Sequence, residues 1–252
     1  MTGAARAARP NESGYSKGGT NVEYYPVQEW VSEVNQGMAD FVLEAEQTLS
    51  QRYGRTIQLV KINVIPGMEE MTLFLRAEDD EALNFTARVT GEQVIRDNYV
   101  ARLRLRECEQ ALETELARCG VTALVNAELP GCDTTGLPAS MPLSALLEHG
   151  DVPGIMVRVA LRGPEAHADR AAEVLKAFGL RMGKWTVFSV FVFDEAGFEA
   201  CREPFSTLPT MTEAILSDLD PVAEFSVSVR DGATRMANVK GNALTGGASN
   251  GR

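Results

Sequence analysis

Hydrophobic residues in the first part of the chain recur at the spacing of an α-helix. They fall 3, 4 or 7 positions apart on one face: Val27, Trp30, Val31, Val34, Met38, Phe41, Ala45 and Leu49. This stripe predicts an amphipathic helix with Pro26 in its first turn and an end near Tyr53-Gly54. Gly37 costs about 1 kcal/mol relative to alanine inside a helix, so a break or a close packing contact there is an alternative.

The pattern then changes to an alternation of every second residue. Residues 57–65 and 71–77 are β-rich, and the segment 66–70 between them contains Pro66 and Gly67, which predicts an antiparallel pair. Residues 84–90 form a third strand, and its inner face carries Phe85, Ala87 and Val89. The result is a helix followed by a three-stranded meander.

A long amphipathic helix follows a turn at Gly91-Glu92. Asp97 or Asn98 can accept hydrogen bonds from its free amides, and Gly120 suits a left-handed residue at its end. Its apolar face carries Leu105, Cys108, Leu112, Leu116 and Cys119. We expect the charged residues largely off that face to be solvated, as on a helix packed against a sheet. They are Arg102, Arg106, Glu109 and Glu113.

The segment after this helix predicts a strand and a connector. Residues 121–129 can return as a strand. Residues 130–154 are rich in proline and glycine, and they contain a short helical turn around 143–148. This connector is the best candidate for an internal boundary.

The last part of the chain has a different order of elements. Residues 155–162 alternate as a half-buried strand, and 165–178 form a helix closed by Gly179. Residues 185–193 are apolar at nearly every position, which predicts a central strand covered on both faces. The remaining elements are two short helices and a strand, at 194–202, 211–219 and 223–230.

These elements predict an α+β fold built from two modules. Residues 23–130 have the order α-β-β-β-α-β, residues 155–231 have the order β-α-β-α-β, and the connector 131–154 separates them. Residues 1–22 and 232–252 are rich in Gly, Ala, Ser, Asn and Thr without a period, so we expect disordered tails. The pattern leaves open whether the modules share one sheet.

The charge balance argues against several partners. Lys and Arg number 24 against 35 Asp and Glu, and the net charge of -11 repels phosphate backbones and anionic membrane surfaces. The sequence has no apolar run long enough for a membrane span, and residues 1–20 have no apolar signal-peptide core. We therefore expect a soluble chain with no nucleic-acid partner and no transmembrane segment.

No catalytic group stands out from the motifs. Gly14-Tyr15-Ser16-Lys17-Gly18 matches the nucleophile pattern G-x-S-x-G, but that motif needs a strand before it and a helix after it. His149 and His167 are the only histidines, and neither is spaced with another His or Cys for a metal, which favours surface residues. We expect no catalytic residue, no cofactor-binding residue, no cofactor and no metal ligand.

Acidic and asparagine motifs also have structural interpretations. Glu78-Asp79-Asp80-Glu81 could suggest calcium, but four consecutive carboxylates in a hairpin favour a solvated turn. Asp194-Glu195 follows the buried strand, where open α/β sheets place ligands, although N-capping by Asp194 is simpler. Asn11-Glu12-Ser13 and Asn84-Phe85-Thr86 match glycosylation acceptors, which matter only in a eukaryotic secretory context.

The four cysteines indicate free thiols. Cys108 and Cys119 are 11 residues apart, so a helix separates them by about 16 Å and they cannot bridge each other. No C-x-x-C pair exists in the sequence. Buried free thiols are the favoured interpretation, and a long-range disulfide involving Cys132 or Cys201 is the alternative for an extracellular protein.

One succession of residues resembles secreted lipoproteins of Gram-positive bacteria. It comprises Arg52-Tyr53-Gly54, the strand 85–90 and its turn, Asp97-Asn98-Tyr99 with the charged helix, and Val190-Phe191-Val192-Phe193-Asp194. The resemblance spans about residues 24–200, and it implies a location at the extracellular face of the cell envelope and no catalytic residues. The signal and the anchoring cysteine are missing, which a lipobox removed before residue 1 would explain, with residues 1–21 as a flexible stalk.

Three classes of function follow. We favour a non-enzymatic cell-envelope protein that contacts a protein partner, with a lipid anchor outside the given sequence. The first alternative is a small-molecule-binding protein with a pocket between the modules, for which Trp185, Phe188 and Phe191 are circumstantial support. The second is a cytoplasmic enzyme of carboxylate chemistry. Two facing carboxylates would favour the enzyme, a closed apolar cleft the binder, and a broad exposed apolar patch the protein partner.

Overall fold

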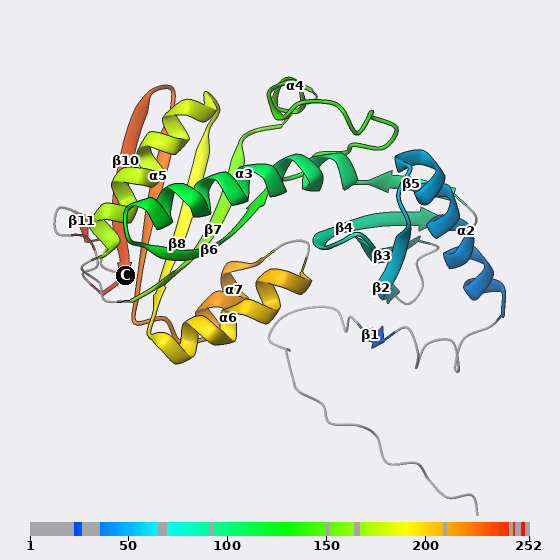
Figure 1. The fold of residues 1–252 in the computed structure, drawn as a ribbon, viewed down its shortest axis with the longest axis horizontal. Coiled ribbons are helices and arrows are strands. Elements are labelled where there is room, and N and C mark those ends of the chain that lie inside the picture. The colour runs from blue at the N-terminus through cyan, green and yellow to red at the C-terminus, as the bar shows by residue number, and fades with distance from the viewer. Residues whose placement is uncertain are drawn as a thin grey trace, which may run out of the picture.

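Two sheets joined by one long helix make up the fold (Figure 1). The computed structural model describes residues 23–26, 36–64, 70–90, 93–149, 152–163, 167–208, 211–241, 244 and 248–249 of the chain. The predicted α+β class with a meander is confirmed. Within these residues, none of the helices has the length and apolar character that crossing a bilayer requires.

The first sheet is antiparallel and has the strand order β1-β2-β3-β4-β5. Its strands are β1 Glu23–Pro26, β2 Ile57–Val64, β3 Glu70–Ala77, β4 Asp80–Thr90 and β5 Gln93–Asp97. Helix α2, Gln36–Tyr53, buries Leu49 against Ile62 and Phe85 of this sheet. The helix end near Gly54 and the antiparallel pair are confirmed.

Two predictions for the first sheet are wrong. Pro26 ends the edge strand β1 opposite Lys61 instead of starting a helix, a place that proline tolerates because no ladder donor is needed there. The residues after the turn at 91–92 form β5 before the long helix begins. The turn at 91–92 and the turn at 66–69 lie outside the described residues, as do residues 27–35.

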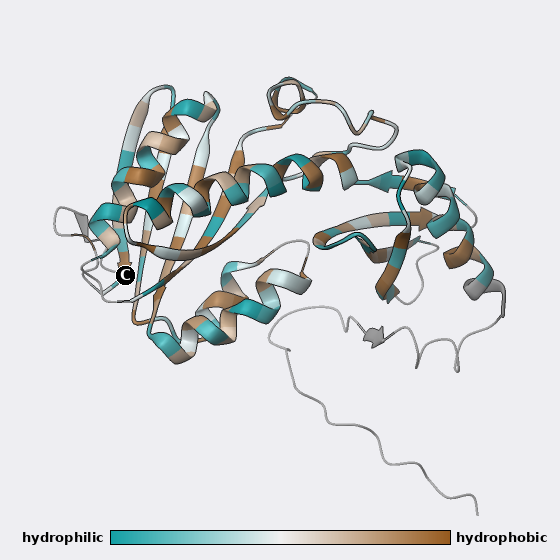
Figure 2. Cartoon of the chain, viewed as in Figure 1, coloured by the Kyte–Doolittle hydropathy of each residue, from teal (hydrophilic) through white to brown (hydrophobic). Residues whose placement is uncertain are grey.

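The second sheet has the order β11-β10-β9-β8-β7-β6, with β7 parallel to β8. Its strands are β6 Thr122–Glu128, β7 Ile155–Arg162, β8 Thr186–Phe193, β9 Ala223–Arg230, β10 Ala233–Lys240 and β11 Ala248–Ser249. Helices α3, Tyr99–Arg118, and α5, Ala168–Met182, pack on one face. Helices α6, Glu195–Thr207, and α7, Glu213–Asp218, pack on the other. Figure 2 shows hydrophobic and hydrophilic positions alternating along α3 and α5, as two-faced helices require.

Helix α5 does not end at Gly179. It continues to Met182 and closes at Gly183, whose φ of 66° is the left-handed conformation expected of a C-terminal glycine. Gly179 lies inside the helix because its Cα faces the sheet, where an added Cβ would lie 2.7 Å from Cγ2 of Val229. Close packing, and not helix termination, therefore requires this glycine.

Strand β7 is buried on both faces, although the alternation predicted a half-buried strand. Arg158 and Ala160, on the face expected to meet solvent, are both buried. Ala160 packs in the cluster that α6 and α7 form with β8, including Phe191 and Phe198. The central position of β8 between β7 and β9 is confirmed.

The expected disordered tail from residue 232 is wrong for Ala233–Lys240, which form β10. Asp231 and Gly232 connect β9 to β10 with φ values of 52° and 76°. Two central residues with positive φ define the hairpin turn that an Asp-Gly dipeptide favours. The first tail, residues 1–22, lies outside the described residues.

Helix α3 lies along the open edge of the second sheet. The outward amides of β6 donate to its side chains, Val125 N to Glu113 Oε1 at 3.0 Å and Ala127 N to Glu109 Oε1 at 2.7 Å. Arg102 Nη1 donates to the Ala127 carbonyl and, at 3.1 Å, to Glu109. These side chains replace the neighbouring strand that β6 lacks, which protects an otherwise exposed edge.

The prediction that the charged residues of α3 are solvated is therefore wrong for Arg102 and Glu109. Arg102 is 4% exposed and Glu109 is 2% exposed, while Arg106 and Glu113 are partly buried. Residues that repeat every three or four positions lie on one face of a helix. On α3 this charged face contacts the edge strand β6 instead of solvent. The apolar stripe beside it, which includes Leu105 and Leu112, packs on the sheet as predicted.

The connector packs against both halves of the molecule. Its short helix α4, Leu143–Glu148, forms where predicted, and it places Leu146 in the first core and Leu147 in the second. Strand β6, which we grouped with the first module, is hydrogen-bonded to β7 in the second sheet. The division of the chain into modules at residues 131–154 stays a prediction.

Asn84 on β4 joins the two halves on the other side of α3. Its carbonyl accepts a hydrogen bond from Arg102 Nε at 3.3 Å, and its side-chain amide donates to the Ser206 carbonyl of α6 at 2.6 Å. Arg102 thus contacts both sheets at once. The position of the halves relative to each other depends on this buried arginine and its partner Glu109.

Replacing Glu109 by alanine should destabilise the fold strongly. The change leaves the buried Arg102 without its carboxylate and Ala127 N without an acceptor, for which we expect a loss of about 3–5 kcal/mol in the free energy of unfolding. Glu107→Ala is the matched control, because Glu107 pairs with Arg104 at the surface and should cost below about 1 kcal/mol. Urea unfolding curves measure both, and equal losses would contradict the proposed role of Glu109.

Candidate functional site

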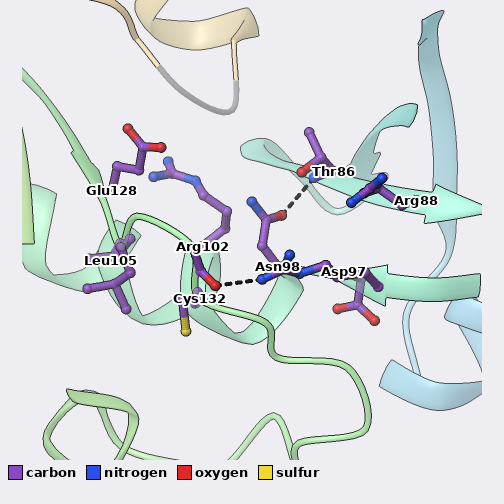
Figure 3. A pocket seen from close by; sticks show the side chains of 12 residues that line it. Thr86, Arg88, Asp97, Asn98, Arg102, Leu105, Glu128 and Cys132 are labelled. Atoms are coloured by element: carbon purple, nitrogen blue, oxygen red, sulfur yellow. Dashed lines mark hydrogen bonds between the residues drawn. The ribbon is translucent and has the colours of Figure 1, made fainter. Parts of the chain in front are cut away.

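A pocket of about 180 Å³ lies where the two sheets meet, beside the first turns of α3 (Figure 3). Its volume corresponds to roughly six water molecules. The lining comes from β4 and β5 of the first sheet, from α3, from the end of β6, and from the connector. Its polar members are Thr86, Arg88, Arg96, Asp97, Asn98, Arg102, Glu128 and Cys132.

Three arginines line this pocket, and they differ in burial. Arg102 is buried and held by Glu109 and two carbonyls. Arg88 pairs with Glu70, and its side chain is 44% exposed. Arg96 donates to the Gly131 carbonyl and lies 3.6 Å from a carboxylate oxygen of Asp133, with 40% of its side chain exposed. Arg88 and Arg96 are cross-strand partners on β4 and β5, so they present their charges at the same edge of the pocket.

Asn98 is held at the pocket by its side-chain oxygen. Asn98 Oδ1 accepts a hydrogen bond from Thr86 N at 2.7 Å (Figure 3). The Asn98 NH2 group makes no hydrogen bond within the described part of the chain, and the side chain lines the pocket. Asn98 occupies the N-cap position of α3 but does not cap it, because Asp97 Oδ1 accepts from Tyr99 N at 3.1 Å. Asp97 is therefore the residue that accepts a free amide of this helix.

The Asp97 carboxylate is inaccessible to solvent and is already engaged by three donors. Besides Tyr99 N, its carboxylate accepts from Arg52 Nη1 at 2.9 Å and from the Tyr53 hydroxyl at 2.7 Å. Burial raises the pKa of Asp97 despite these hydrogen bonds, and burial beside this carboxylate also raises the pKa of Tyr53. The cluster fixes the end of α2 to the start of α3, where the rings of Tyr53 and Tyr99 stack at 4.0 Å.

Glu128 supplies the accessible carboxylate of the pocket. Its Oε2 accepts from Arg158 Nη1 at 2.6 Å, and its side chain is 30% exposed. Oε1 makes no hydrogen bond with the described residues. Figure 3 shows Glu128 and Arg102 at the same end of the pocket.

Cys132 in the connector brings a thiol to the pocket, but not a reactive one. Burial raises its pKa, and the neighbouring Asp133 raises it further. A thiol with a raised pKa stays protonated at neutral pH and is a weak nucleophile. The geometry thus offers groups that bind and no activated nucleophile at this residue.

A wider groove of about 480 Å³ lies between α3 and α6. Its charged residues are engaged elsewhere: Arg106 lies 3.7 Å from Glu109, Arg202 pairs with Glu199, and Glu113 accepts from Val125 N. Their charges are therefore largely compensated. The pocket beside Asn98 is the better candidate, because an amide donor and a carboxylate oxygen there have no protein partner among the described residues.

The histidines and the acidic pairs that the sequence offered as candidate ligands lie away from this pocket. His149 is exposed after α4, and His167 is half-buried before α5. Asp194 accepts from Gly197 N at 2.8 Å and caps α6, which confirms that interpretation. Asp79 of the acidic loop pairs with Arg55 at the surface. Among the described residues, no three His, Cys, Asp or Glu side chains gather in a group that could hold a metal ion.

The remaining motifs form no site within the described part of the chain. Asn84 of the possible glycosylation acceptor is 4% exposed and engaged with Ser206, so it cannot accept a glycan in the folded protein. The G-x-S-x-G match at 14–18 and Asn11 lie outside the described residues. The aromatic residues expected at an inter-module pocket lie elsewhere: Phe188 and Phe191 are in the cores of the second sheet, and Trp185 is exposed near Arg230.

The pocket residues that sequence reasoning missed had one visible signal. Strand 84–90 was assigned an inner face of Phe85, Ala87 and Val89, so Thr86 and Arg88 had to point the other way. Arg96 could not be placed without recognising β5. The role of Glu128 could not be inferred, because it lies far along the chain from Asn98 and Arg102 and no local pattern indicates that these residues share a pocket.

Comparisons with known proteins support the fold alone. No protein-family model and no curated protein matches this sequence. A solved structure of a DUF5037 family protein from Ruminococcus gnavus is similar, with a TM-score of 0.59 and 14% identity over 76% of this chain and 92% of that chain. At that identity the likeness indicates a shared fold and no shared function.

Cysteine labelling should separate the four thiols, all of which are free. Burial raises the pKa of Cys108 to about 12 and that of Cys201 to about 11, so thiolate is scarce at neutral pH. Cys119 is exposed, in contrast to the predicted burial. We expect iodoacetamide at pH 7.5 to modify Cys119 first, at least tenfold faster than Cys132, by peptide mass spectrometry. Faster labelling of Cys132 would show an activated thiol at the pocket.

Proposed function

We propose that this protein is a non-enzymatic binding protein whose pocket between the two sheets holds a small molecule by an anionic group. One observation carries the proposal: the NH2 group of Asn98 and three arginines line a cavity beside α3. Guanidinium and amide donors recognise carboxylate and phosphate oxygens by charge-assisted hydrogen bonds. An anion at this place also lies near the N-terminal end of α3, where the helix dipole favours negative charge.

Guanidinium groups gather at this pocket in an otherwise acidic chain. The net charge of the protein is -11, yet the pocket is lined by Arg88, Arg96 and Arg102 against Asp97 and Glu128. Arg52, from outside the pocket, compensates Asp97 at 2.9 Å. Glu70, Asp133 and Glu109 likewise pair with Arg88, Arg96 and Arg102. The support for an anion is therefore the N–H donors that the partly exposed Arg88 and Arg96 present at one edge of the pocket, and not an excess of positive charge.

Binding fits this geometry better than catalysis. The two carboxylates of the lining could suggest an acid and base pair, but Asp97 is engaged by three donors and its side chain is inaccessible to solvent. Glu128 is left without a second titratable partner in the lining, and the Cys132 thiol is protonated at neutral pH. These features support the choice of a binder over the alternative of an enzyme.

Propionate should stabilise the protein against heat. For a Kd of about 1 mM, 10 mM ligand adds about 1.4 kcal/mol by linkage. For a chain of this size that corresponds to a rise of about 3–6 °C in Tm. Arg96→Gln should reduce the rise by at least half, and Arg118→Gln, an exposed charge at the other end of α3, should leave it unchanged. Inorganic phosphate serves as a second anion, and no shift with either would contradict the proposal.

We further propose that the protein resides at the cell envelope and contacts a protein partner there. The support is the resemblance of residues 24–200 to lipid-anchored proteins of Gram-positive bacteria. Fractionation of native host cells should recover the protein with the envelope, and affinity capture from that fraction should yield a specific partner. Recovery from the cytosol alone would overturn this location.

A further inference from the structure

We infer that the ligand carries an ammonium group beside its carboxylate, and that the pocket therefore selects a small α-amino acid. The inference rests on the proposed function, because it assumes that the arginines and Asn98 hold an anionic group. It adds a role for Glu128, the one accessible carboxylate of the lining.

The acceptor of the pocket comes from a different sheet than the donors. Arg88 and Arg96 belong to the first sheet, and Asn98 immediately precedes α3. Glu128 is the last residue of β6 in the second sheet. A ligand that reaches both must offer acceptors to one side and a donor to the other, as a zwitterion does.

A simple anion or a simple cation can bind either the donors or the acceptor of the pocket, but not both. A simple anion would leave Glu128 Oε1 without a partner and would meet its negative charge, which opposes binding in a pocket partly shielded from water. A simple cation would meet three arginines instead. An ammonium group beside a carboxylate places its N–H donors at Glu128 while the carboxylate remains on the side of Arg96 and Asn98.

The hydrogen bonding of Glu128 suits it to accept from an ammonium group. Arg158 is largely buried behind it and binds only Oε2, which fixes the direction of the carboxylate and leaves Oε1 for a second donor. An oxygen held in place by a buried partner loses little freedom when a ligand binds. The pair of Arg158 and Glu128 thus orients the acceptor.

The size and the apolar wall of the pocket restrict the side chain of the amino acid. At about 180 Å³ the cavity is smaller than the roughly 300–1,000 Å³ of pockets for drug-sized ligands. Ala101, Leu105 and Leu129 are buried and form its apolar lining. A methyl-sized side chain against this wall suits alanine, whereas a large aromatic side chain exceeds the space.

Three probes that differ by one group test the inference on the unmodified protein. L-alanine, propionate, which lacks the ammonium, and ethylamine, which lacks the carboxylate, are titrated while amide signals are followed by NMR. We expect alanine to bind at least tenfold more tightly than propionate, since a charge-assisted hydrogen bond is worth about that much, and ethylamine not to bind. Signals of residues lining the pocket should shift together.

The outcomes separate this inference from the proposed function. Equal affinities for alanine and propionate would overturn the inference that the ligand is a zwitterion, and would leave the proposal of anion binding intact. Binding of neither compound would overturn both. Tighter binding of ethylamine than of propionate would also overturn both, because the arginines would then not hold the ligand.

The variant Glu128→Gln tests the residue itself. It removes the negative charge but keeps the shape of the side chain, so alanine affinity should fall about tenfold. Propionate affinity should stay the same or rise, because the charge that opposes a simple anion is gone. Glu115→Gln is the matched control, since Glu115 pairs with Arg181 on the exposed side of α3. A parallel loss of both ligands, with an unchanged circular dichroism spectrum, would contradict the role of Glu128. If Glu128→Gln does not fold, the three-probe comparison still decides the inference.

Discussion

The buried pair of Arg102 and Glu109 on α3 is the contact on which the arrangement of this molecule depends. Glu109 accepts the outward amide of Ala127 on β6, and Arg102 donates to the Ala127 carbonyl as well as to the Asn84 carbonyl of the first sheet. Burying two charges is costly, and the pair is tolerated because the two side chains bind each other as well as backbone groups of both sheets. One helix thereby completes the edge of one sheet and attaches the other.

This arrangement also creates the pocket. With α3 along β6, the residues at its beginning reach past the end of the strand, so that Asn98 and Arg102 line the same cavity as Glu128. The connector contributes Gly131 and Cys132 to the lining. It is held to β5 because Thr134 N donates to the Asp97 carbonyl, while Thr135 Oγ1 accepts from Asp97 N. Stability and the candidate binding site therefore share residues, which is why Arg96 and Glu128, both outside the buried pair, are the better residues for testing binding.

The periodicity of the sequence identified most helices and strands, and each wrong prediction has a physical cause. Asp231-Gly232 carried the signal of a hairpin, but the Gly-rich composition after it masked β10. Gly179 predicts a helix end in error, since a glycine required by contact with Val229 looks the same in a sequence as one required by a positive φ. The charged stripe of α3 predicts exposure to solvent in error, because a polar helix face has the same pattern whether it meets water or an open sheet edge.

The sequence by itself determined the α+β class, the meander, the central β8 and the ends of α2 and α3, because short-range periodicity and turn chemistry are local properties. The tertiary structure decided which polar residues are buried and which converge. Arg96 and Glu128 are 32 positions apart in the chain and belong to different sheets, so only the docking of α3 across both sheets brings them to one pocket. Their meeting depends on long-range packing, which the pattern of a single segment does not encode.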